Sequence, residues 1–102
     1  MIVDADWYKG AKRVRIIDSA TKHDISIVDI EYVYKNAVSG LVLVDDPKKV
    51  MLFGWDTAGR ALEVGYFRDG EVNVVMHANK LRKTYEKYLM NWTKYQVLED
   101  LL

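Results

Sequence analysis

The spacing of apolar residues along the chain changes twice, and the first stretch has helical spacing. From Ala11 to Lys22, the residues Val14, Ile17 and Ala20 fall on one side and charged residues occupy the other sides. This pattern is typical of an amphipathic helix. We therefore predict a first helix over residues 11–22.

A second helix is predicted directly after Ser26. Ser26 and Asp29 have the spacing of a capping box, in which a hydroxyl at the helix start satisfies a free backbone N–H. The pair Ser39-Gly40 is expected to end the helix, because glycine adopts the left-handed conformation of a helix C-terminus without steric cost. The residues that share one face of this helix are Ile27, Ile30, Val33, Tyr34 and Ala37.

Beyond Gly40 the period falls to two, which is typical of β-strands. Asp69-Gly70 favours a tight hairpin, and the short connections favour an antiparallel meander. In the last strand, strict alternation places His77 on the same face as Asn73 and Val75. The predicted strands are Leu41–Val44, Val50–Trp55, Arg60–Phe67 and Glu71–Ala78.

Helical spacing returns at Lys80, and the residues on one face are Leu81, Tyr85, Tyr88, Leu89 and Trp92. The tail from Thr93 to Leu102 extends this helix or adds another. The sequence thus predicts a single α+β domain over residues 1–102. Its expected architecture is two N-terminal helices, a three- to four-stranded antiparallel meander, and a C-terminal helix or helices.

Composition excludes several classes of protein. The 15 basic and 15 acidic residues cancel, so no global field attracts nucleic acid or membranes. The absence of cysteine removes disulfides, thiolate zinc sites and cysteine nucleophiles. No apolar stretch approaches the ~20 residues of a membrane helix, and the start lacks the features of a signal peptide. We expect a cytoplasmic protein with no membrane segment, no metal and no cofactor.

Local charge is less even than the total. Residues 9–15 carry four positive charges and no negative one, and residues 80–87 carry four positive charges against Glu86. Such clusters bind phosphates in nucleic-acid-binding proteins. They are also common on the solvated faces of amphipathic helices. Both interpretations stay open at this point.

His77 carries the most specific chemical hypothesis. It ends the last predicted strand, and Arg68 lies across the same predicted hairpin. Histidine moves protons near neutral pH, and arginine holds phosphate through two parallel hydrogen bonds. RNA cleavage without a metal needs both functions. The alternative is that His77 only covers a polar face of the sheet.

Three stretches resemble the BrnT-type toxins. Lys22-His23-Asp24-Ile25-Ser26 is similar to the family's K-H-G-[VI]-S opening, and residues 53–64 resemble its hairpin with a Gly-Arg pair. Arg68, the strand ending in His77-Ala78 and the basic segment with Tyr85 resemble the family's next strand and helix. The resemblance covers residues 7–88.

This resemblance implies a RelE-like fold and a ribonuclease toxin of a bacterial type II toxin–antitoxin system. The toxin would cleave RNA without a metal and arrest growth. An antitoxin encoded beside it would bind it and hold it inactive. The expected assembly is a homodimer of the toxin or a toxin–antitoxin hetero-oligomer. Under this hypothesis Arg60 and Arg68 hold the phosphate and His77 moves protons. The residues expected to bind RNA are Lys22, Lys49, Lys80, Arg82 and Lys83.

The sequence departs from the family pattern at four positions. Asp24 stands where the family has glycine, and Val74, His77 and Asn79 stand where it has Arg, Ser and Arg. Two other functions stay open. One is a non-catalytic protein-interaction module of the same fold that uses the apolar tail. The other is a DNA-binding winged-helix regulator built from the two N-terminal helices and a hairpin.

Overall fold

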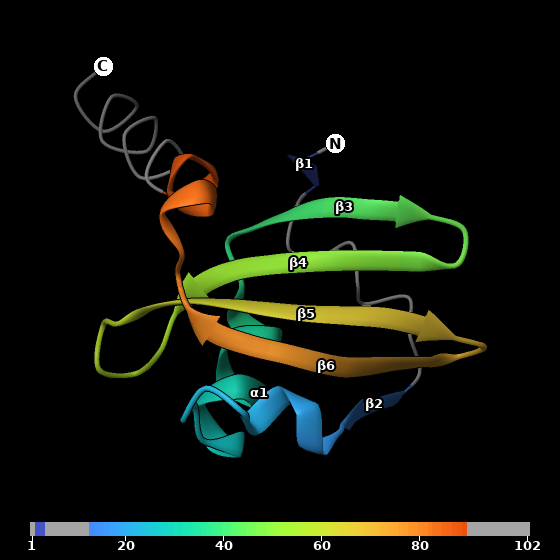
Figure 1. Cartoon of the computed structure of the whole chain (residues 1–102), viewed down its shortest axis with the longest axis horizontal. Helices are drawn as coiled ribbons and strands as arrows, with labels where there is room; N and C mark the ends of the chain where they lie inside the picture. The colour runs from blue at the N-terminus through green and yellow to red at the C-terminus, as the bar shows by residue number, and fades with distance from the viewer. Residues whose placement is uncertain (1, 4–12, 90–102) are drawn as a thin grey trace.

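The computed structural model describes residues 2–3 and 13–89 and is dominated by one mixed β-sheet (Figure 1). The sheet has six strands in the order β1-β3-β4-β5-β6-β2. Among the described residues no helix has the length and apolarity needed to cross a bilayer. The strands are β1 (Ile2–Val3), β2 (Arg13–Ile16), β3 (Ser39–Asp45), β4 (Lys48–Trp55), β5 (Ala61–Asp69) and β6 (Val72–Lys80). The helical elements are the 3-10 turns η2 (Asp18–Thr21) and η3 (Lys83–Tyr85) and the helix α1 (Ile27–Asn36).

The predicted first helix is wrong. Residues 13–16 form β2, which pairs in parallel with β6 and places Arg13 beside Val72 and Ile16 beside Val75. Residues 18–21 form only the short turn η2. The segment Arg-Val-Arg-Ile also alternates with period two, and its β-branched residues favour a strand. The segment thus fits both a helix and a strand, and its hydrogen-bonded pairing with β6 makes it a strand. Residues 11 and 12 lie outside the described part.

The second helix and the meander are confirmed. The hydroxyl of Ser26 accepts a hydrogen bond from the backbone N–H of Asp29 at 3.2 Å and caps α1. Strands β3 to β6 pair in sequence order, each antiparallel to the next. Gly70 turns the β5–β6 hairpin with φ of +59°. The predicted helix end is wrong, because Ser39 and Gly40 already belong to β3.

The predicted C-terminal helix begins later than expected. Lys80 is the last residue of β6, and the chain continues through Leu81 and Arg82 before η3 begins at Lys83. Residues 86–89 are helical. Trp92 and the apolar tail lie outside the described residues. Within the described residues the fold is therefore a strand-rich mixed sheet with helix α1 and a short C-terminal helix. The predicted pair of N-terminal helices is wrong, because β2 and η2 take the place of the first one.

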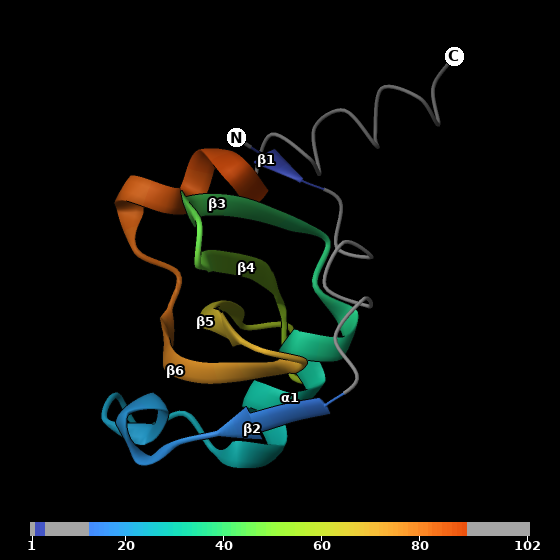
Figure 2. The same cartoon turned by 90° about the vertical axis from the view of Figure 1, so that its right-hand side faces the viewer.

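The two faces of the sheet are covered differently (Figure 2). Helix α1 packs on β4 and β5 and covers one face, where Ile30 and Val33 of the helix join the core residues Val64 and Tyr66. The segment after β6 covers only one end of the other face, where Leu89 packs with a second, smaller cluster. The turn η2 lies against β6.

A β-bulge in β6 changes the direction of its side chains. Tyr66 pairs with Val75 and Gly65 pairs with His77, so Met76 is the extra residue. The bulge reverses the alternation that the sequence predicted. His77 therefore lies on the face opposite Val75 and α1, and its predicted placement with Asn73 and Val75 is wrong.

Candidate functional site

An open hollow lies on the face of the sheet opposite α1, lined by residues of η2, of the sheet and of the segment that follows β6. Its volume is about 470 Å³. Gly65 lies beneath it, and a Cβ atom there would be 3.3 Å from His77 Cβ and 3.4 Å from Met51 Sδ. Glycine at this position leaves room for both side chains. The lining residues are Ser19, Leu43, Lys49, Met51, Met76, His77, Arg82 and Tyr85.

Three charged or titratable side chains meet at the edge of this hollow. The Glu63 carboxylate is fully buried, and His77 Nε2 lies 2.8 Å from its Oε2 atom. Arg82 donates to the same carboxylate from its backbone N–H at 2.9 Å and from its side chain at 2.7 to 3.1 Å. Glu63 therefore fixes the positions of His77 and Arg82 relative to each other.

The charge of Glu63 determines which ring nitrogen of His77 faces it as a donor. Burial alone would raise the pKa of Glu63, but the hydrogen bonds from His77 and Arg82 hold that pKa below its usual value. Glu63 is thus a carboxylate at neutral pH and acts only as an acceptor. His77 must then donate from Nε2, which leaves Nδ1 with a free lone pair in the neutral ring.

A second histidine reaches the same place. The Ser19 hydroxyl donates to the backbone carbonyl of Met76 at 2.7 Å and ties η2 to β6. The turn that follows carries His23, whose ring lies edge-on to that of His77 with a centroid separation of 5.6 Å. Sequence reasoning kept the two histidines apart, because only the parallel pairing of β2 with β6 brings the start of the chain to this site.

Two of the predicted RNA-binding residues line the hollow. Lys49 is exposed and forms no ion pair in the described part of the chain. Arg82 is half exposed and lies over the ring of Tyr85 at 5.2 Å. Lys22 precedes His23 and is exposed, and Lys83 is exposed in η3. Lys80 pairs with Leu62, which faces α1, so Lys80 lies on the opposite face of the sheet from the hollow.

The structure does not bring Arg60 and Arg68 to His77. Arg60 is bound by Asp56 at 2.9 Å and lies 3.6 Å from Asp29 in the first turn of α1. Arg68 donates to Asn73, which in turn donates to the Tyr34 hydroxyl of α1. Both arginines therefore stabilise the α1 side of the molecule.

Glu63 and His23 were missed from the sequence as members of the site. Glu63 sits in a strand where alternation alone does not separate a buried carboxylate from a solvated one. Its only signal is that it lies among apolar neighbours, in Ala-Leu-Glu-Val-Gly. In residues 2–3 and 13–89, no three side chains of the metal-binding types gather into one group.

Comparison with known proteins adds no relative from which to interpret this site. No family model, curated protein or solved structure matches the chain. The resemblance to BrnT-type toxins stays a prediction.

Proposed function

We propose that this chain is a metal-independent endoribonuclease and the toxin of a bacterial toxin–antitoxin pair. The observation that carries the proposal is the buried Glu63 carboxylate that orients His77 beside an open, cation-lined hollow. A carboxylate that fixes the tautomer of a histidine is a common way to build a general base.

His77 is the general base of the proposed reaction. Its Nδ1 atom takes the proton of a ribose 2′-hydroxyl, and the 2′-oxygen bonds to the adjacent phosphorus. Glu63 stabilises the imidazolium that forms, because its carboxylate accepts from Nε2 at 2.8 Å. The bond from phosphorus to the 5′-oxygen then breaks and leaves a 2′,3′-cyclic phosphate.

His23 and the cations complete the reaction. A protonated His23, edge-on to His77, gives its proton to the departing 5′-oxygen. Lys49 and the N–H groups of Arg82 that Glu63 does not use stabilise the negative charge on the phosphate oxygens. Tyr85, which lines the same hollow, lies beneath the Arg82 guanidinium and helps to hold it in place.

One detail of the backbone supports the toxin assignment. Asp24 has φ of +61°, the left-handed conformation that glycine adopts most easily. It is the position at which the BrnT family has glycine. We infer that the protein acts in the cytoplasm on cellular RNA and is held inactive by a cognate antitoxin.

The test is cleavage of a synthetic RNA by the purified full-length protein in the presence of EDTA. We expect products ending in 2′,3′-cyclic phosphate and 5′-hydroxyl, identified by mass spectrometry. His77→Ala and His23→Ala should each lower the rate by about 10²-fold or more, since general acid–base groups contribute that much. Arg68→Ala is the matched control, because Arg68 bonds on the α1 side and should keep most of the activity.

Two results would contradict this function. RNA left intact by a folded wild type would favour the non-catalytic interaction module. Loss of activity in Arg68→Ala with full activity in His77→Ala would show that the arginines predicted from the sequence, and not His77, act in the reaction. The winged-helix regulator needs a helix over residues 11–22, and β2 and η2 stand in its place.

A further inference from the structure

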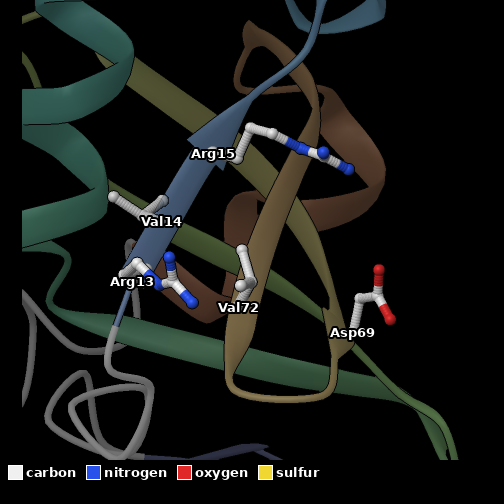
Figure 3. Close-up of a pocket in the computed structure, with 5 residues that line it drawn as sticks. All are labelled: Arg13, Val14, Arg15, Asp69 and Val72. Carbon is white, nitrogen blue, oxygen red and sulfur yellow. The ribbon is translucent and has the colours of Figure 1, made fainter.

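Strand β2 carries two arginines on the same face of the sheet as the hollow. Arg13 pairs with Val72 and Arg15 with Val74 in the parallel register. Paired residues share a face, and the bulge in β6 returns His77 to the face of Val74. Figure 3 shows Arg15 extending across β6, whereas Val14 points toward α1.

The two guanidinium groups belong to exposed residues. Neither Arg13 nor Arg15 forms an ion pair within the described residues. With Val72 they line a second open hollow of about 360 Å³ (Figure 3). Asp69 lines it too, but it forms no ion pair with either arginine in the part of the chain described. Positive charge here is therefore available to a ligand.

The arginines continue the row of polar groups that begins in the first hollow. At about 3.3 Å per residue along β6, the position of Arg15 lies about 10 Å from that of His77, and Arg13 about 17 Å. Arg82 follows the C-terminal end of β6 and stands at the other end of this row. Lys49 pairs with Phe67, which pairs with Val74, so Lys49 lies level with Arg15 across the sheet. The spacing suits an extended polyanion that runs along β6 and passes through the site.

We propose that Arg13 and Arg15 bind backbone phosphates of single-stranded RNA that leaves the His77 hollow along β6. The inference rests on the proposed function. It adds the path that the RNA follows on the protein surface beyond the nucleotides that react. Guanidinium groups hold phosphates through paired hydrogen bonds, and this contact does not depend on the base sequence.

An acidic protein strand paired to β2 is the less favoured occupant. The backbone N–H groups of Arg13 and Ile17 already donate to β6. In a parallel ladder every second residue bonds to the neighbouring strand, so in β2 only Val14 and Ile16 direct their backbone groups away from β6. A four-residue strand therefore offers little for strand addition, while its arginine side chains lie on the side of the reaction site.

The first experiment measures binding without cleavage. A fluorescent 2′-O-methyl RNA of ten nucleotides lacks the attacking hydroxyl, and its affinity is followed by anisotropy over a range of salt concentrations. The salt exponent is the magnitude of the slope of the logarithm of the binding constant against the logarithm of the salt concentration. Each lost phosphate contact lowers it by about 0.7 for single strands, so Arg13→Ala/Arg15→Ala should lower it by about 1.4. At 0.1 M salt this corresponds to roughly 25-fold weaker binding. Circular dichroism and thermal melting check that each variant is folded.

Two matched variants isolate the cause. Arg13→Lys/Arg15→Lys keeps both charges and should keep most of the salt exponent. Lys35→Ala removes a positive charge from α1, on the other face, and should leave the salt exponent unchanged. A second readout compares substrates: Arg13→Ala/Arg15→Ala should lower kcat/KM for the ten-nucleotide RNA and leave cleavage of a dinucleotide unchanged.

The outcomes separate this inference from the proposed function. RNA binding with the expected drop in salt exponent supports the path along β2 even if no RNA is cleaved. Cleavage of RNA with an unchanged exponent in Arg13→Ala/Arg15→Ala overturns the path and leaves the function standing. Arginine-dependent binding of polyglutamate in place of RNA also overturns it and assigns the strand to an acidic protein.

Discussion

Glu63 is a carboxylate without solvent contact, and its neighbours determine what it does. An isolated buried charge is very unfavourable in a protein interior. Here the imidazole of His77 and both the backbone and side chain of Arg82 donate to the two carboxylate oxygens. The desolvation of one acidic residue is thus offset by groups that the proposed reaction needs in fixed positions.

Asp24 illustrates how a single backbone angle supports the site. Its φ of +61° turns the chain directly after His23, and a β-branched residue there is strained. We expect Asp24→Val to lower the free energy of unfolding by about 1–2 kcal/mol. Asp24→Gly should cause no comparable loss, because glycine adopts this angle freely. Urea denaturation measures both, and equal stability of the two variants would contradict the assigned conformation.

Elements that depend on short-range signals could be predicted from the sequence, and elements that depend on long-range strand pairing could not. The cap at Ser26 and the Asp69-Gly70 turn are short-range features, and α1 and the β5–β6 hairpin follow from them. Strand β2 depends on β6, which lies far along the chain, so its helical spacing misled the prediction. His77 was predicted as a site residue from the sequence, but the contacts it makes in the structure depend on a β-bulge that the spacing of apolar residues does not indicate.

The packing of α1 on the sheet depends on Gly54 of β4. A Cβ atom there would lie 3.2 Å from the Ala37 Cα and 3.4 Å from Val33 Cγ1. The closer neighbour is backbone, so the end of the helix would have to move. We expect Gly54→Ala to destabilise the protein by about 1–3 kcal/mol, as overpacking does. Chemical denaturation tests this, and a variant as stable as the wild type would show that the helix adjusts freely.

For the whole molecule, two carboxylates link folding to pH. Burial raises the pKa of Glu63 and Asp56, but the hydrogen bonds from His77 and Arg82 to Glu63, and from Arg60 and Ala58 to Asp56, lower each below its usual value. A lowered folded pKa stabilises the protein above the unfolded pKa of about 4, and this stability is lost as pH falls through the folded value.

Stability should therefore stay nearly constant from neutral pH to about pH 5 and decrease below about pH 4. Glu63→Gln removes one of the two groups, so its stability should decrease less steeply with acid and start from a lower level at pH 7. Urea denaturation at a series of pH values gives both curves. Glu86→Gln, at an exposed position, is the control. Parallel curves for Glu63→Gln and the wild type would contradict the role of this carboxylate.

The parallel pairing of β2 with β6 also has a consequence for synthesis on the ribosome. The first of these strands emerges early and its partner emerges last among the described strands. Until then β2 has no neighbour, and His23 cannot meet His77. A nascent or truncated chain that ends before β6 lacks the complete site. Under the proposed function, RNA cleavage would then begin only after β6 has been translated.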